Sequence, residues 1–287
     1  MFGSDQSRLR FARPAVRALA VGAVAIMLTQ CEREAAAPPA APAAAPAPPP
    51  SVPADAPVPA LSRAELLRAV TDAASAYAAG QPAARGDSLV GRTFAIRTAF
   101  ACSGPAPAAA VETGADGLPS AAWGPDGDTI RLGLTPGDWT RSSLIADAGA
   151  TTPWEAVEGF WLARPWLAAE TCPKVTRDPL QSGVLAPSPQ TVGLAAVFDA
   201  DGSRIARRNG RAYAFTQRAE GDALLTAPAG GYRLLLEGRV ASFPDGRAIR
   251  CQAAGPDQRP VCVAAVQLDR VAFEDAAGAM LSEWRGG

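Results

Sequence analysis

The feature that most constrains the fold is a set of short stretches in which apolar side chains alternate with other residues. In RTFAIRTAFAC, the side chains of Phe94, Ile96, Phe100 and Cys102 fall on one face of an extended chain. Because successive side chains of a strand point to opposite faces, this period of two predicts a strand with one buried face. Four further stretches are typical of strands: TIRLGL, TVGLAAVF, YRLLLEGRV and VCVAAVQL.

Turn-forming dipeptides separate these stretches. Asp-Gly pairs begin at residues 116, 126, 201 and 245, and an Asn-Gly pair begins at 209. Such pairs favour the positive φ angles of tight hairpins. Residues 191–217 therefore predict a three-stranded antiparallel meander that turns at 201–202 and 209–210. The whole pattern predicts a mostly β fold, with antiparallel sheets in a sandwich or barrel and about two helices. An α+β fold is the alternative.

Two stretches predict helices because each holds a capping box, in which two side chains satisfy the free backbone N–H groups of the first turn. LSRAELL contains Ser62 and Glu65 and begins a helix predicted over about 62–79. TPWEAVEGFW contains Thr152 and Glu155, with a proline at the first helical position, and predicts a second helix over its own length.

The N-terminal residues predict export. Four arginines precede an uncharged apolar run from Ala18 to Thr29. The run is too short to cross a bilayer, and it has the length of the apolar region of a signal peptide. We therefore expect residues 1–30 to be a signal peptide.

The stretch LTQC, which ends this region, resembles the lipobox of bacterial lipoproteins. In that family a cysteine follows the apolar run, with a leucine three residues before it. Leu28 and Cys31 match this pattern, whereas Gln30 departs from the small residue that the family prefers. The resemblance implies attachment of lipid to Cys31 and a membrane-anchored protein that faces the periplasm. The alternative is ordinary signal cleavage at residues 35–37, immediately before a proline.

Residues 31–60 predict a tether between the lipid and a folded part. The segment from Ala35 to Ala60 has ten prolines and almost no charge, a composition that favours an extended chain over a helix. We expect two subdomains beyond it: an α+β subdomain over 61–178 and an antiparallel β subdomain over 179–287. The boundary falls in a stretch rich in turn-forming residues.

Four cysteines follow the tether. They include no C-x-x-C pair of the kind that binds zinc, so two disulfides are expected in an oxidising compartment. Of the three pairings, the one that respects the subdomain boundary joins Cys102 to Cys172 and Cys251 to Cys262.

Charge and histidine content narrow the function. Beyond residue 30 the chain keeps 23 basic and 27 acidic side chains of the 27 and 28 in all, and this balance argues against nucleic-acid binding. The chain has no histidine, which removes Ser-His-Asp and Cys-His catalysis and histidine-ligated metal sites. The sequence GDSL at 86–89 resembles the nucleophile block of GDSL hydrolases, but that family needs a catalytic histidine. We predict no catalytic residue, metal or cofactor.

Two groups of side chains are candidate binding residues. Guanidinium groups bind carboxylates and phosphates, and exposed indoles stack on sugars. Four arginines surround the Asn-Gly pair at 209–210, and three tryptophans lie close together in the sequence. Each group has a structural alternative: a charged hairpin edge for the arginines and a filled core for the tryptophans. The candidates are Arg204, Arg207, Arg208, Arg211, Trp154, Trp161 and Trp166.

Three classes of function stay open. We favour a noncatalytic envelope lipoprotein whose β-rich part binds an envelope protein or cell-wall glycan. One alternative is a histidine-independent hydrolase that uses two carboxylates on cell-wall glycan. Glu155 and Glu158, one turn apart on the predicted second helix, form such a pair, although carboxylates at this spacing are more often merely solvated. The other alternative is a purely structural envelope protein.

Overall fold

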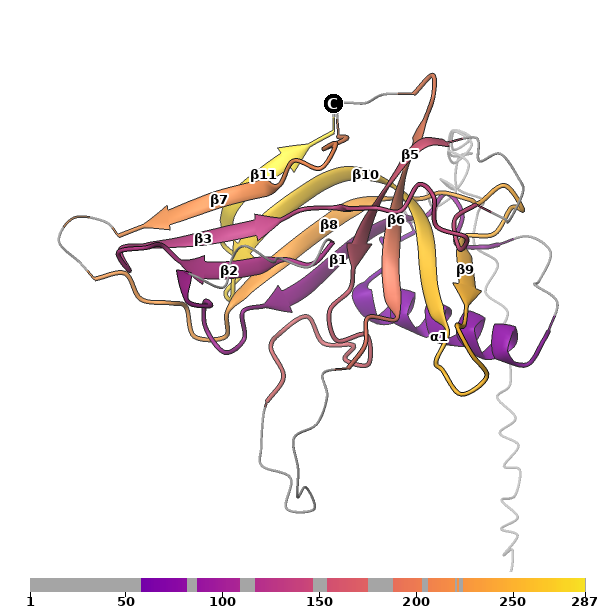
Figure 1. Ribbon diagram of the computed structural model, residues 1–287, viewed down its shortest axis with the longest axis horizontal. Helices are drawn as coiled ribbons and strands as arrows, with labels where there is room; N and C mark the ends of the chain where they lie inside the picture. Colours follow the sequence, from indigo (N-terminus) through magenta and orange to yellow (C-terminus); the bar gives the residue numbers. More distant parts are fainter. Residues whose placement is uncertain are drawn as a thin grey trace, which may run out of the picture. The chain divides into compact units, whose positions relative to one another are not determined.

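The computed structural model describes residues 58–81, 87–108, 117–146, 154–174, 188–202, 206–219, 221 and 224–286. Within these residues there are one helix and eleven strands (Figure 1). The predicted signal peptide, the predicted lipid-attachment residue Cys31 and most of the predicted tether lie outside the described residues. The elements are α1 (Arg63–Ala78), β1 (Thr93–Phe100), β2 (Ser120–Trp123), β3 (Thr129–Leu134), β4 (Gly137–Asp138), β5 (Trp154–Trp161), β6 (Val192–Asp199), β7 (Tyr213–Arg218), β8 (Tyr232–Val240), β9 (Ile249–Gln252), β10 (Val261–Asp275) and β11 (Met280–Arg285).

The strands form two sheets. The larger sheet has the order β1-β8-β10-β6-β5-β4, with β9 and β11 also paired to β10, and the smaller sheet has the order β2-β3-β7. Neighbouring strands run antiparallel except β6 and β10, which pair in parallel. The prediction of a mostly β fold with antiparallel sheets in a sandwich-like arrangement is confirmed.

Strand β10 joins the parts of the larger sheet. Its first half, Val261–Val266, pairs with β9 on one edge and β6 on the other. Its second half pairs with β8 and β11. The register against β8 shifts between Leu268 and Arg270, which leaves Asp269 as an extra residue. Such a bulge bends a strand and increases its twist, so one strand serves two differently oriented groups of neighbours.

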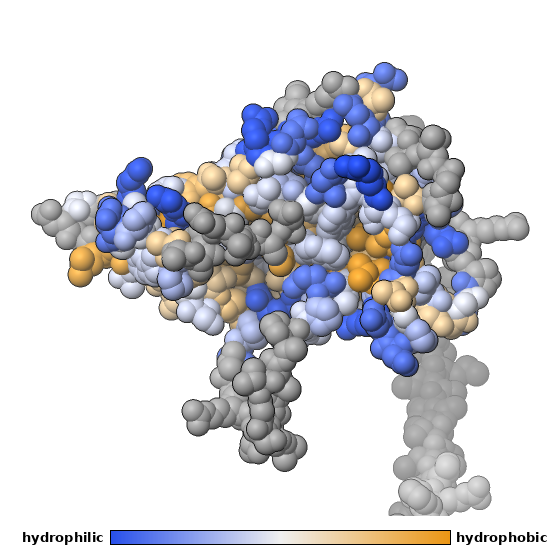
Figure 2. All heavy atoms as spheres, viewed as in Figure 1, coloured by the Kyte–Doolittle hydropathy of each residue, from blue (hydrophilic) through white to orange (hydrophobic). Residues whose placement is uncertain are grey.

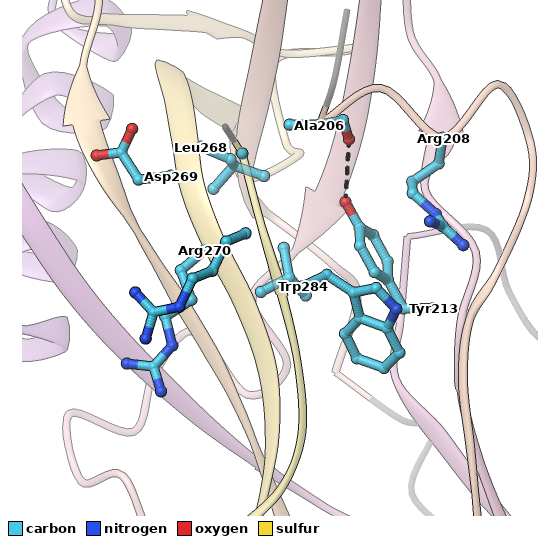
Figure 3. Close-up of a pocket in the computed structure, with 10 residues that line it drawn as sticks. Ala206, Arg208, Tyr213, Leu268, Asp269, Arg270 and Trp284 are labelled. Atoms are coloured by element: carbon cyan, nitrogen blue, oxygen red, sulfur yellow. Dashed lines mark hydrogen bonds between the residues drawn. The ribbon is translucent and has the colours of Figure 1, made fainter.

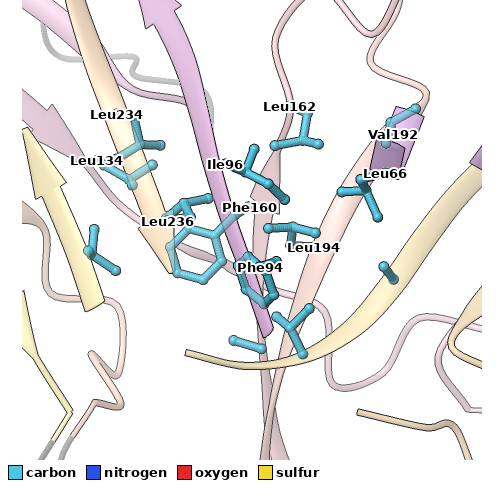
Figure 4. Close-up of a cluster of buried hydrophobic side chains, with 14 of the residues drawn as sticks. Leu66, Phe94, Ile96, Leu134, Phe160, Leu162, Val192, Leu194, Leu234 and Leu236 are labelled. Carbon is cyan, nitrogen blue, oxygen red and sulfur yellow. The ribbon is translucent and has the colours of Figure 1, made fainter. Parts of the chain in front are cut away.

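The main core fills the space between the two sheets and α1 (Figure 4). The faces predicted from alternation are the buried ones: Phe94, Ile96 and Phe100 of β1 lie inside with less than 5% exposure. The alternating apolar residues of β3 and β6 are also buried, with at most 8% exposure. These residues are Ile130, Leu132, Leu134, Val192, Leu194, Ala196 and Phe198.

A second, smaller cluster covers the opposite face of β5, β6 and the first half of β10. Trp154 and Val157 of β5 lie in it beside Ala195 and Val197 of β6. Trp139 packs against the edge of this cluster. Its indole ring lies directly on Gly159 and Gly193. A Cβ added at these glycines would come within 2.0 Å and 2.6 Å of the ring, respectively. The middle of the larger sheet is therefore buried on both faces.

The helix predicted at 152–161 is wrong. Residues Trp154–Trp161 form strand β5, and Thr152 and Pro153 lie outside the described residues. As a strand, this stretch buries Phe160 in the main core and Val157 in the second cluster, and β4 and β6 satisfy its backbone on both edges. A helix would bury only one face and would place Gly159 in its interior, where glycine is unfavourable.

The meander predicted over 191–217 is also wrong. Strand β6 pairs with β5 and β10, whereas β7 pairs with β3 in the other sheet. The Asn209-Gly210 turn does form, with φ angles of 53° and 75°, but it lies in a connection between the sheets. Similarly, residues 56–287 form one compact unit whose larger sheet takes strands from both sides of residue 178. We therefore describe this part as one unit and not as two subdomains.

The predicted N-terminal helix is confirmed as α1. Ser62 is its N-cap, and Ser62 and Glu65 make both hydrogen bonds of the capping box. The guanidinium of Arg63 is buried, and burial lowers its pKa to about 10. It donates hydrogen bonds to the carbonyls of residues 163, 164 and 167 and to the Thr98 hydroxyl. These bonds satisfy the buried donors and join α1 to the segment that follows β5.

Both predicted disulfides form. Cys102 follows β1 and bonds to Cys172, and Cys251 of β9 bonds to Cys262, which lies opposite it on β10. Two disulfides in one chain are typical of proteins outside the reducing cytoplasm. Among the described residues, no helix has the length and apolar character needed to span a membrane.

The contact of Trp139 with Gly159 makes a prediction about stability. A methyl group at residue 159 overlaps the indole ring, so Gly159→Ala is expected to lower the free energy of unfolding by about 1–3 kcal/mol. The matched control is Gly133→Ala in β3, where the nearest atom to the added Cβ is 3.6 Å away. Urea unfolding of the two variants measures the difference. Equal stability of both variants would contradict the close packing described here.

Candidate binding pocket

A pocket of about 160 Å³ opens where β7, β10 and β11 approach one another (Figure 3). It lies at the bulge of β10, at the end of β11, and beside the connection that leads into β7. The lining combines apolar, aromatic and charged side chains. They belong to Ala206, Arg208, Tyr213, Leu268, Asp269, Arg270, Val271, Trp284, Arg285 and Gly286.

The bulge of β10 shapes one wall of this pocket. Gly238 of β8 lies opposite Leu268, and a Cβ at Gly238 would come within 2.1 Å of the Gln267 carbonyl oxygen. Glycine at 238 therefore lets the two backbones approach where the register shifts. The carbonyl of the bulged residue, Asp269, accepts a hydrogen bond from the Gly286 N–H at 2.8 Å. This bond holds the end of β11 at the edge of the pocket.

Aromatic rings form another wall. The Trp284 ring makes edge-to-face contacts with Tyr213 at 5.1 Å and Phe273 at 5.5 Å between ring centroids. The Tyr213 hydroxyl donates a hydrogen bond to the carbonyl of Ala206, and burial raises the pKa of Tyr213. The phenol thus stays neutral and fixes the loop that carries Ala206.

Three guanidinium groups border the pocket, and they differ in their partners. Arg270 pairs with Glu237 at 3.2 Å and with Glu283 at 2.8 Å, and Arg285 pairs with Glu283 at 3.1 Å. Arg208 instead donates to the carbonyls of residues 211 and 212 and lies 4.6 Å above the Tyr213 ring. Figure 3 shows Arg208 and Arg270 on opposite sides of Trp284.

Two carboxylates of β5 hold the loop that carries Arg208. The Oε1 of Glu158 accepts hydrogen bonds from the backbone N–H groups of Arg208 and Asn209, each at 2.8 Å. Glu155 accepts a hydrogen bond from the Arg207 guanidinium at 2.9 Å. Glu158 is buried, and its Oε2 has no hydrogen-bond partner among the described residues. Burial is the main cause that raises the pKa of Glu158.

The four candidate arginines have different environments. Arg208 lines the pocket, Arg207 is paired with Glu155, and Arg211 is exposed. Arg204 lies outside the described residues. The arginines that are described lie in a connection between two sheets, not on the hairpin edge that the sequence predicted.

The three candidate tryptophans do not form a common exposed surface. Trp154 is buried in the second cluster, and Trp161 contacts the Trp139 ring at 4.7 Å. Trp166 is 56% exposed. On the face seen in Figure 2, apolar residues reach the surface in patches separated by hydrophilic ones. The core-filling alternative therefore describes Trp154, and a sugar-stacking platform of all three is not present.

The carboxylate pair proposed for hydrolysis has a different geometry from the expected one. Glu155 and Glu158 lie on a strand and not one turn apart on a helix. Both carboxylates are engaged with the loop at 207–209. In the part of the chain that the structure describes, no group of three or more Cys, Asp or Glu side chains is placed to hold a metal ion.

Sequence reasoning missed most residues of this pocket. Trp284 and Tyr213 are 71 positions apart, and neither lies in a motif. Arg208 was among the sequence candidates. Gly238 is a further local signal, because a glycine that interrupts an apolar strand suggests a bulge or a close backbone approach. The comparisons with known proteins add no relative: no family model, curated protein or solved structure matches the chain.

The raised pKa of Glu158 predicts a pH-dependent stability. Because the folded state favours the protonated acid, ionisation costs stability as pH rises from about the ordinary value of 4.5 through the raised pKa. Glu158→Gln keeps a carbonyl acceptor but does not ionise. We expect the unfolding free energy of the variant, relative to that of the natural chain, to increase from pH 4 towards pH 8. Unfolding in urea at several pH values measures it, and a difference that falls with pH would contradict the assignment.

Proposed function

We propose that this chain is an exported, noncatalytic binding lipoprotein, held to a membrane by lipid on Cys31 and presenting its ligand site on a β-rich unit. The observation that carries the proposal is the pocket bounded by Arg208, Trp284 and the bulge of β10. Polar and apolar groups converge there in a concave site of about 160 Å³. Pockets for drug-sized ligands begin at about 300 Å³, so this site suits a smaller molecule. The lack of histidine in the chain supports a binding role over acid–base catalysis.

The construction of the pocket supports binding because its walls are held in place from several directions. β10 and β11 are paired strands, and Trp284 is fixed between two aromatic rings. The remaining wall is a loop, but Glu158 and Tyr213 both hydrogen-bond to its backbone. A site held in this way loses little conformational entropy when a ligand binds.

The N-terminal segments support the tethered location. The apolar run and Cys31 match an exported lipoprotein in all but Gln30. At about 3.1 Å per residue, the proline-rich tether would reach roughly 80 Å from the membrane if fully extended. The two disulfides suit an oxidising compartment. A binding unit on such a tether can reach ligands in the envelope without leaving its membrane.

The anchor is tested on the protein isolated from its own cells. Intact mass and N-terminal sequencing are expected to show a chain that begins at Cys31 and carries acyl mass. Cys31→Ala is expected to lose the acyl mass and to leave the membrane fraction. A mature chain that begins after residue 37 would instead indicate ordinary signal cleavage and would remove the anchor from the proposal.

The pocket is tested by filling it. The full chain in detergent is screened by ligand-observed NMR against small aromatic acids, amides and amines. We expect saturable binding of at least one class, which Ala206→Leu abolishes because the larger side chain occupies the pocket. Ala212→Leu is the matched control, since Ala212 is exposed on the same loop and does not line the pocket. If no probe binds the natural chain saturably, the pocket is not a ligand site.

A further inference from the structure

The arginines on one side of the pocket form ion pairs with acidic side chains, whereas the arginine on the other side does not. On the β10 side, Arg270 and Arg285 form ion pairs with Glu237 and Glu283. Asp269 lies on the same side (Figure 3), and its carboxylate makes no hydrogen bond with the described residues. The guanidiniums of this side are thus already neutralised by acids, and an additional anion would meet Asp269 there.

Arg208, across the pocket, makes hydrogen bonds but no ion pair with the described residues. Its Nε and one Nη donate to backbone carbonyls, which carry no net charge. Its other terminal nitrogen makes no hydrogen bond with the described residues. Glu158 interacts electrostatically with Arg208, but the hydrogen bonds of that carboxylate go to backbone N–H groups. Arg208 therefore keeps both N–H donors of that terminal nitrogen, and a positive charge, at the edge of the pocket.

The space beside Arg208 suits a compact, flat apolar group. Leu268, Val271 and the indole of Trp284 contribute apolar lining. The volume of about 160 Å³ leaves room for a group of about one ring but not for a larger ligand. Aromatic rings also favour edge or offset contacts with a second ring. The body of the ligand is therefore about the size of one ring.

We propose that the pocket binds a small monocarboxylate with a compact, ring-sized apolar body, whose carboxylate accepts hydrogen bonds from the free terminal nitrogen of Arg208 and whose body lies against Trp284. This inference rests on the proposed function, because it names the ligand class of the same pocket. A single negative charge matches Arg208, the one guanidinium of the lining that makes no ion pair with the described residues. A phosphate dianion would exceed that charge, and Asp269 in the same pocket would repel it more strongly than it repels a monoanion.

The loop geometry makes Arg208 the selective group. Glu158 accepts hydrogen bonds from the N–H groups of residues 208 and 209, and the Arg208 guanidinium lies 4.6 Å from the centre of the Tyr213 ring. A guanidinium fixed in this way is already oriented before a ligand arrives, which is the condition under which a charged hydrogen bond contributes most to discrimination.

Four probes of similar shape test the proposal: benzoate, benzamide, benzylammonium and phenyl phosphate. Titrations of the full chain by ligand-observed NMR are expected to show saturable binding of benzoate, about tenfold weaker binding of the neutral amide, and no binding of the amine. Phenyl phosphate is expected to bind more weakly than benzoate. Arg208→Gln is expected to weaken benzoate binding about tenfold and to leave the benzamide affinity unchanged.

The matched control is Arg218→Gln, because Arg218 is an exposed arginine of β7 that does not line the pocket and makes no side-chain hydrogen bond with the described residues. Its benzoate affinity is expected to equal that of the natural chain. Near-ultraviolet circular dichroism and the urea midpoint verify that each variant is folded.

Three other outcomes would each contradict a part of the proposal. If benzamide, the amine or phenyl phosphate binds at least as tightly as benzoate, and Ala206→Leu abolishes that binding, the pocket is a ligand site but the monocarboxylate class is wrong. If Arg218→Gln weakens benzoate binding as much as Arg208→Gln, the assignment to Arg208 is wrong. If no probe binds the natural chain saturably, the inference and the proposed pocket both fail.

Discussion

The structure depends on the pairing of one long strand with four others. β10 hydrogen-bonds to β6 and β9 through its first half and to β8 and β11 through its second half. The bulge at Asp269 separates the two halves and lets the strand turn from one set of neighbours to the other. Both clusters of buried side chains include residues of β10. Most of the fold is therefore organised around this strand.

The bulge also explains why a pocket forms where it does. A regular strand would continue the packing of the core, whereas the extra residue changes the direction of β10 next to the end of β11. The space left at this point is bordered by side chains from two strands and one loop. The loop would be the weakest wall, but Glu158 and Tyr213 hold its backbone. The buried carboxylate thus supports the site although it does not line it.

The features that could be predicted are those that depend on neighbouring residues in the sequence. Alternation identified the buried faces of β1 and β3, because burial of one face requires apolar residues at every second position. The capping box of Ser62 and Glu65 marked the start of α1 for a similar local reason. The same motif at 152–155 predicted a helix that does not exist. There, burial on both faces and pairing on both edges of β5 outweigh a local preference of about 1 kcal/mol.

The sequence by itself determined which residues of several strands are buried, the position of α1, and a set of cysteines suited to two disulfides. The tertiary structure alone decided which strands pair, that β6 and β10 run in parallel, and that Arg208 lies across a pocket from residues more than fifty positions away in the sequence. The reason is physical. Backbone hydrogen bonds between strands are nearly independent of residue type, so pairing is decided by how the apolar faces of distant segments fit together.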